Sequence, residues 1–372
     1  MKIKFGIVHC VLCIFFYLCI VKVEIIDNIS QFPQFEAQNV FQTAGWMRLF
    51  EGEDDTKVVL FAVYANAQCT MHNAQLDAIG DVEKSQLLLL QPVVIQRFVK
   101  WLPWRLGAYA VAWCEPWRAG NIADEEAVEA FVLMNEAIVK YCRKRALYVE
   151  YRHFSENNIY GLILNSRSSI LNFQFSIFNS RLPWWNIYHD IEAGEDVAEK
   201  MKRDKRRQFK LSFEAGVEVV LEPTKEQIVE WYGLLKGLYR RIRRPLPSVN
   251  VFLKLNELGI GRVFVVVYDG RVVSGSAILY FLNKAKNAQL LTLNSQLFYE
   301  WYRASVYEKI KNVYPSVVIT WQVLQLVADM GGGRFDFMGA GRRNKEYGVR
   351  QFKLEFGGEL TPEFRYRKYF LF

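Results

Sequence analysis

The chain has 372 residues, of which 51% are hydrophobic and 23% charged, an ordinary globular composition with enough length for two hydrophobic cores. Its six cysteines and four histidines show no metal-ligand spacing, so the sequence supports neither a metal site nor a disulfide framework, and a reducing compartment is expected. The net charge of +8 favours partners that carry phosphate or an anionic headgroup.

The N-terminus carries an apolar run at residues 5–21, behind Lys2 and Lys4. A positive segment followed by an apolar one is typical of a secretory signal or a membrane anchor. The run is short for a spanning helix, and no A-x-A-like cleavage site follows it. Three interpretations stay open for residues 1–22: a signal anchor, an upstream translation artefact, or a buried first element.

Hydrophobic runs in the first half predict strands at 23–27, 57–64, 87–95 and 146–151. A short helical segment is expected within 31–50. Apolar residues at helical spacing predict a helix over 124–145, with Asp124 as a plausible N-cap. The aromatic stretch 102–117, punctuated by proline and glycine, is expected to line a cleft or pack as a loop rather than form a regular element.

The second half repeats this plan. Helical spacing is found at 196–213, 224–241 and 321–330, and strands are expected at 216–220, 288–293 and 334–337. A hairpin over 261–280 turns at Asp269-Gly270. The coarse repetition predicts two related α/β domains, 23–195 and 196–372, each with a mixed central sheet flanked by helices.

The stretch 331–359 is the most informative part of the chain. Glycines flank a short strand, and a basic loop is expected to follow it and to end on Phe352-Lys353. An acidic residue inside an apolar strand, Asp336, and a lysine beside a phenylalanine are what a polar site in an apolar wall needs. A turn-rich surface with solvated charges is the alternative interpretation.

The order D-F-x-G-x-G from Asp336, followed by Y-G-V-x-x-F-K-x-x-F-G-G-E from Tyr347, resembles the C-terminal block of the Fem family. Members of this family are non-ribosomal aminoacyltransferases that build peptidoglycan cross-bridges on a doubled GNAT acyltransferase fold. The resemblance is strongest after Met201. It implies transfer of an aminoacyl group from aminoacyl-tRNA to an amino group of a peptidoglycan precursor, with no cofactor. Residues 242–262 contain no charged heptad arm, so no long coiled-coil arm is expected.

The resemblance also assigns candidate site residues. Lys353 and Asp336 are the catalytic candidates, with Lys353 assisting transfer or holding the terminal phosphate of the donor RNA. Phe352 is its aromatic neighbour, and Tyr347 is expected to line the cleft. A solubilising lysine and a hydrogen-bonded structural aspartate are the alternatives.

Substrate binding is expected at the end of the helix 224–241. Arg241 falls on the arginine that, in the family, grips the nucleotide diphosphate of the precursor, and Arg240 is an alternative occupant of this role. An arginine that interacts only with its own helix dipole is the competing interpretation.

Other functions stay open. Acyl-CoA is a rival donor, although the R/Q-x-x-G-x-G/A loop that holds its pyrophosphate is missing where it was expected, at 294–305. A non-catalytic protein that binds anionic lipid or nucleotide-sugar through the basic run 200–210 is another alternative. We expect a cytoplasmic protein, or one associated with the inner face of the membrane. A nucleic-acid-binding module has only the charge in its favour.

Overall fold

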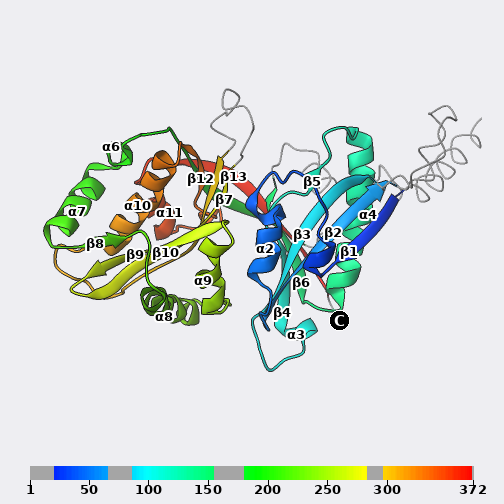
Figure 1. Cartoon of the computed structure of the whole chain (residues 1–372), viewed down its shortest axis with the longest axis horizontal. Helices are drawn as coiled ribbons and strands as arrows, with labels where there is room; N and C mark the ends of the chain where they lie inside the picture. The colour runs from blue at the N-terminus through cyan, green and yellow to red at the C-terminus, as the bar shows by residue number, and fades with distance from the viewer. Residues whose placement is uncertain (1–20, 66–85, 155–179, 283–295, 371–372) are drawn as a thin grey trace, which may run out of the picture.

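The computed structural model describes residues 21–65, 86–154, 180–282 and 296–370. Its first half follows the predicted order of strands and helices closely (Figure 1). Its elements are β1 (Val21–Ile26), η1 (Ile29–Gln31), η2 (Val40–Gln42), α2 (Ala44–Leu49), β2 (Thr56–Ala65), β3 (Leu87–Arg97), α3 (Trp104–Gly107), β4 (Ala108–Ala112), β5 (Trp117–Arg118), α4 (Asp124–Arg143), β6 (Tyr148–Phe154) and β7 (Ser180–Ile191).

The second half repeats this order after two linking helices, which supports the predicted duplication. Its elements are α6 (Val197–Lys200), α7 (Arg203–Glu214), β8 (Glu218–Val220), α8 (Lys225–Arg241), α9 (Val249–Glu257), β9 (Gly261–Tyr268), β10 (Arg271–Leu282), β11 (Gln296–Ser305), α10 (Pro315–Asp329), β12 (Gly333–Asp336), α11 (Gly348–Leu354) and β13 (Glu359–Tyr369). The stretch 242–262 holds the nine-residue helix α9 in place of a long arm.

The strands of the described residues belong to one 13-stranded sheet in the order β1-β2-β3-β4-β6-β13-β7-β12-β11-β10-β9-β8, with β5 beside β3. The pairs β4·β6 and β11·β12 are parallel, and the other pairs are antiparallel. Each parallel pair is connected through a helix, α4 or α10, as parallel strands require. The predicted mixed sheet flanked by helices is therefore confirmed.

The two halves exchange their last strands. The C-terminal strand β13 pairs with β6 of the first half, while β7 pairs with β12 of the second half. The two exchanged strands also pair with each other. Figure 1 shows them running between the two lobes. A division of the chain at 195/196 stays a prediction, but the sheet itself crosses that point.

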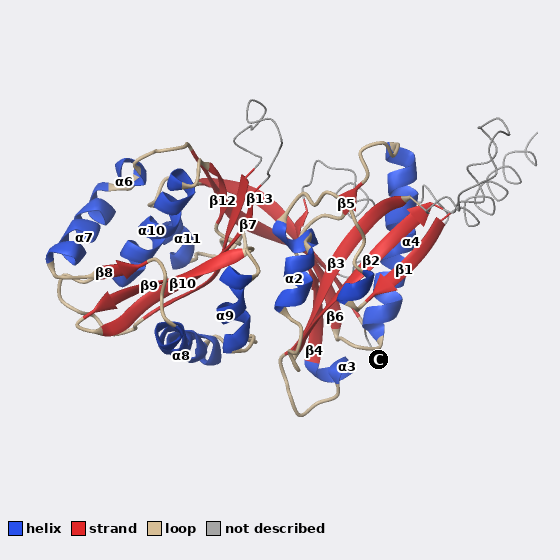
Figure 2. Cartoon of the chain, viewed as in Figure 1, coloured by secondary structure: helices blue, strands red, loops and turns tan. Residues whose placement is uncertain are grey.

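Helices cover the second half on both sides of the sheet (Figure 2). The helices α8 and α9 lie on one side, and α6, α7, α10 and α11 on the other. On the first side, Trp46 of α2 packs against Trp301 of β11 with ring centroids 5.5 Å apart, and Phe252 of α9 lies 5.8 Å from Trp301. These buried rings join the two halves in one hydrophobic cluster.

Local chemistry explains several of the elements. The β9–β10 hairpin turns at Asp269 and Gly270, whose φ angles of 51° and 70° are those that a two-residue turn needs. Helix α8 begins at a capping box in which Thr224 and Gln227 each bond the other's backbone N–H. Helix α4 buries Phe131, Met134 and neighbouring residues against the first half of the sheet.

Other expectations are corrected by the structure. The N-cap of α4 is Ala123, and Asp124 is the first helical residue. The stretch 102–117 contains regular elements, because the apolar run Ala108–Ala112 is buried between β3 and β6 as the strand β4. The strand predicted at 288–293 lies outside the described residues. Residues 296–305, within the stretch considered for a phosphate loop, form the strand β11.

Candidate functional site

The parallel strands β11 and β12 separate at the centre of the second half. They pair only where Leu297–Tyr299 faces Arg334–Asp336, and β12 then ends while β11 continues to Ser305. The helix α11 places Lys353 at this point of separation. The prediction that Phe352 and Lys353 end a loop is wrong, because both lie on this helix.

Lys353 is buried, with only 6% of its surface exposed. Its Nζ donates to the carbonyl oxygens of Phe337 at 2.6 Å and Gly339 at 3.0 Å, and lies 3.6 Å from a carboxylate oxygen of Glu300 on β11. Burial lowers the pKa of Lys353 to about 8, although Glu300 opposes the shift. The lysine therefore holds its proton at neutral pH, close to the pH at which it would lose it.

The backbone of the loop after β12 is fixed from several sides. Asp336, buried at the end of β12, accepts hydrogen bonds from the backbone N–H of Met338 and from the side chain of Asn186. Asn186 in turn accepts a bond from the backbone N–H of Gly339. Met338 and Gly339 have φ angles of 58° and 111°, a conformation that directs the carbonyls of Phe337 and Gly339 to Lys353. Asp336 thus positions the loop that Lys353 holds.

Phe352 lies between two cations on the outer side of this region. The Nζ of Lys205 and the guanidinium of Arg303 are each 4.9 Å from its ring centroid. Lys205 also lies 3.3 Å from the carboxylate of Glu355, and Arg303 lies 3.3 Å from that of Glu300. The aromatic neighbour of Lys353 is therefore a platform for cations.

The remaining predicted residues lie at the end of α8 and at the start of α11. Tyr347 is 44% exposed and packs on Gly341, where an added Cβ would be 2.8 Å from its ring. Arg240 and Arg241 are exposed at the C-terminal end of α8, and the guanidinium of Arg241 stacks 4.7 Å from the exposed ring of Tyr307. The structure brings Lys353, Phe352 and Asp336 together. It does not place Arg240 or Arg241 in contact with them.

A cavity of about 350 Å³ lies between the two halves. Asp336, Arg334 and Tyr188 line it from the central strands. Its other walls are mostly aromatic or from the first half: Asn39, Phe41, Trp113, Cys114, Glu115, Leu297, Phe298 and Tyr299. Asp336 therefore connects this cavity with the loop that Lys353 holds.

Sequence reasoning missed Glu300, Arg303 and Asn186. Glu300 is an acidic residue inside an apolar strand, the same signal that singled out Asp336, so the same rule would have identified Glu300 from the sequence. Asn186 lies on β7, a strand exchanged between the halves, and no local pattern connects it with the loop after β12.

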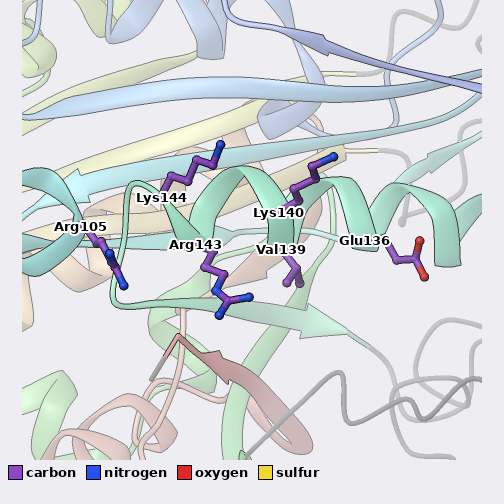
Figure 3. A pocket seen from close by; sticks show the side chains of 6 residues that line it. All are labelled: Arg105, Glu136, Val139, Lys140, Arg143 and Lys144. Atoms are coloured by element: carbon purple, nitrogen blue, oxygen red, sulfur yellow. The ribbon is translucent and has the colours of Figure 1, made fainter. Parts of the chain in front are cut away.

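Two basic hollows lie on the outer surface. One, of about 520 Å³, is lined by Arg105, Glu136, Val139, Lys140, Arg143 and Lys144. Figure 3 shows these side chains along α4, with Arg105 approaching from α3. The other lies on α7 along the basic run 200–210, over Arg203, Arg206, Arg207 and Lys210. Neither hollow contains a predicted site residue, so both are candidates only for surface contacts with anions.

Cofactor and metal positions are limited by local chemistry. The loop before α10, residues 306–314, has no glycine, so it differs from the loop that holds acyl-CoA pyrophosphate. Helix α4 begins with Asp124, Glu125 and Glu126, which oppose an anion at its N-terminus. Within the described ranges, no group of three or more metal-ligating side chains and no helix that could span a membrane is found.

Neither a family model nor a curated protein matches the chain. Among solved structures, the crystal structure of FemX is similar with a TM-score of 0.55 and 12% identity, over 93% of this chain and 97% of that one. A tandem GNAT protein from the clavulanic acid biosynthesis pathway covers 94% of this chain and 99% of its own, at 8% identity and a TM-score of 0.49. The C-terminal domain of a putative lysylphosphatidylglycerol synthetase from Agrobacterium fabrum covers 74% and 80%, at 12% identity and 0.45.

The similarity to FemX supports the predicted fold. The chain has a mixed α/β fold in which two GNAT-like halves share one sheet. At this identity the likeness to FemX extends to the fold alone.

Proposed function

We propose that the protein is an acyltransferase that forms an amide bond, with aminoacyl-tRNA as donor and an amino group of a peptidoglycan precursor as acceptor. The observation that carries this proposal is the buried ammonium group of Lys353 at the point where β11 and β12 separate. When an amine attacks an ester, the carbonyl oxygen gains negative charge, and a fixed cation in a poorly solvated site stabilises it. The tandem GNAT fold and the sequence motif at Asp336 and Tyr347 support the same class of reaction.

The ammonium group already has three acceptors around it: two loop carbonyls and Glu300. Lys353 therefore acts in the resting protein by positioning the loop 337–339 and by adding positive charge behind it. Asp336 and Asn186 fix the same loop from the other side. In this proposal the loop and its cation orient the donor ester, and catalysis comes from positioning and electrostatics without a covalent intermediate.

The choice of donor rests on the N-terminal ends of α10 and α4, the helices that connect the parallel strands. The loop before α10 lacks glycine, and α4 begins with three carboxylates. Both features disfavour a bound acyl-CoA pyrophosphate and leave aminoacyl-tRNA as the better donor. Arg241, with Arg240 beside it, and Tyr347 are proposed to contact the acceptor from the end of α8 and the start of α11.

The test is transfer of radiolabel from a mixed aminoacyl-tRNA pool, and in parallel from acetyl-CoA, to nucleotide-linked peptidoglycan precursors. The full chain is compared with Lys353→Met and with the control Lys57→Met. Lys57 also lies beside an aromatic ring, 5.6 Å from Trp104, but in the first half and exposed. We expect label to move from tRNA, at least about a hundredfold more slowly in Lys353→Met and unchanged in the control.

Other outcomes separate the alternatives. Label that moves only from acetyl-CoA would keep the reaction class and replace the donor. No transfer from either donor, together with binding of anionic lipid vesicles that depends on the basic run 200–210, would favour a non-catalytic binding protein. An equal loss of transfer in Lys353→Met and Lys57→Met would remove Lys353 from the proposed site.

A further inference from the structure

Three arginines surround one carboxylate on the adjacent strands β6 and β13. Glu150 and Arg367 face each other across the two strands. The Nε atoms of Arg152 and Arg367 both donate to the carboxylate of Glu150, and Nη1 of Arg365 lies 3.7 Å from it. Glu150 is fully buried, and the arginine side chains are 12–17% exposed. The cluster therefore has an excess of two positive charges in a place with little water.

Neighbouring charges do not remove this excess. Glu363, two residues from Arg365 along β13, is engaged by the hydroxyl of Tyr188 and the amide of Asn186. Arg343 lies beside it and donates to its backbone carbonyl. The carboxylate of Glu363 also acts on Arg365, but Arg343 adds a further positive charge nearby, so the local balance stays positive by two.

The pKa values of Glu150 and Arg365 reflect the excess of positive charge. Burial raises the pKa of Glu150, but Arg152, Arg365 and Arg367 outweigh it and lower that pKa to about 2. Burial and the nearby charge of Arg152 lower the pKa of Arg365 to about 9. The guanidinium of Arg365 shares the carboxylate of Glu150 with two arginines that lie closer to it. A buried cation that shares its counter-charge in this way is stabilised when a further anion binds to it.

Aromatic rings hold the guanidinium groups in place. Arg152 lies 4.4 Å from the ring of Trp113, Arg365 3.8 Å from Trp184, and Arg367 5.3 Å from Tyr148. Stacked guanidinium groups lose little conformational entropy when they bind an anion, so the cluster is preorganised.

The cluster also lies beside the loop that Lys353 holds. A Cβ added to Gly339 would be 3.1 Å from Nη2 of Arg365 and 3.0 Å from Nε1 of Trp184. That indole N–H is buried and has no hydrogen-bond partner among the residues that the structure describes. Because Gly339 has no side chain, Arg365 approaches the loop backbone closely.

We propose that Arg152, Arg365 and Arg367 form a binding site for a phosphate or diphosphate group of a substrate. A group with two negative charges neutralises the excess, whereas a single carboxylate leaves one charge unpaired. Guanidinium forks match the geometry of phosphate oxygens. The phosphate belongs either to a nucleotide-linked acceptor or to an RNA donor. The site differs from the exposed pair Arg240 and Arg241, and its binding does not depend on acyl transfer.

The test is isothermal titration of the full chain with inorganic pyrophosphate. Arg365→Gln is compared with the control Arg118→Gln, which changes an arginine of β5 that is already paired with Asp124 at 2.7 Å. We expect saturable binding that weakens at least about tenfold in Arg365→Gln and stays unchanged in Arg118→Gln. If Arg365→Gln does not fold, Arg367→Gln is titrated in its place.

Absence of saturable binding by the unaltered chain, or equal weakening in Arg365→Gln and Arg118→Gln, would overturn the proposal. Competition then identifies the source of the phosphate. Displacement of pyrophosphate by UDP supports the nucleotide-linked acceptor, and displacement by a 5′-phosphorylated CCA trinucleotide supports the RNA. Failure of both to displace it would contradict a substrate site. Binding of pyrophosphate without any label transfer would separate this site from the proposed function.

Discussion

The buried imidazole of His189 makes the stability of the fold depend on pH. His189 lies on β7 with 3% of its surface exposed, and neither ring nitrogen has a hydrogen-bond partner in the described residues. Burial, with a contribution from Lys200, lowers the pKa of His189 to about 4. The unfolded chain binds a proton near pH 6.5, so unfolding takes up a proton between these two values. The free energy of unfolding therefore falls as the pH falls through this window.

The size of the effect follows from the shift. Linkage gives a loss of about 2 kcal/mol between pH 7 and pH 5, and about 3 kcal/mol once the pH is below both values. In His189→Leu this part of the pH dependence should disappear, because the variant has no group that titrates there. At pH 7 the variant should unfold with nearly the same free energy, since the imidazole makes no hydrogen bond that leucine would lose.

Urea unfolding of both proteins at pH 7 and pH 5 measures the difference. Ile191→Val, a change in the same strand without a titrating group, is the matched control and should lose about 1 kcal/mol at both values. If His189→Leu keeps the pH dependence of the unaltered chain, the imidazole is protonated in the folded state and the reasoning is refuted.

Three further predictions test packing, strand exchange and the site. Gly275→Ala places a Cβ 2.6 Å from the ring of Trp231 and should lower the free energy of unfolding by about 1–3 kcal/mol in urea. Gly237→Ala in α8, whose Cβ would meet nothing within 4 Å beyond its own helix backbone and chain neighbours, should raise it by about 0.5–1 kcal/mol. Removal of residues 359–372 takes β13 out of the sheet, so both halves should lose cooperative thermal unfolding; a surviving transition of either half would contradict this. Label transfer should decline above about pH 8 as Lys353 loses its proton, and this decline should be absent in Lys353→Arg.

Local patterns predicted the elements that depend on near neighbours. Helices α4 and α8 and the β9–β10 hairpin follow from periodicity, capping and the Asp-Gly turn. The strand exchange could not be predicted in this way, because the sequence of β13 does not show whether it pairs with β6 or with β12. The strand β4 was missed because proline, glycine and tryptophan around it outweigh a short apolar run.

The candidate site was found only in part, for a similar reason. Lys353 was singled out by its motif, but its burial depends on carbonyls that the left-handed backbone of Met338 and Gly339 turns towards it. The arginine cluster had a visible signal. In E-Y-R at Glu150 and R-Y-R at Arg365, charges alternate with a buried tyrosine, which places both sets of charges on one face of a strand. What no pattern showed is that these two strands lie side by side.

The exchange of strands explains why the two charged groups meet. Since β13 crosses from the second half into the first, Arg365 and Arg367 lie against Glu150 of β6, and the strand begins directly after the helix that carries Lys353. The carbonyl oxygen of Gly339 accepts a hydrogen bond from Lys353, and the guanidinium of Arg365 lies close to the same glycine. A substrate phosphate bound at the arginines would therefore lie close to the loop proposed to orient the acyl group. In a protein with unexchanged halves, the strand that follows the helix of Lys353 would not pair with β6. The exchange would therefore couple the proposed anion site to the proposed site of transfer.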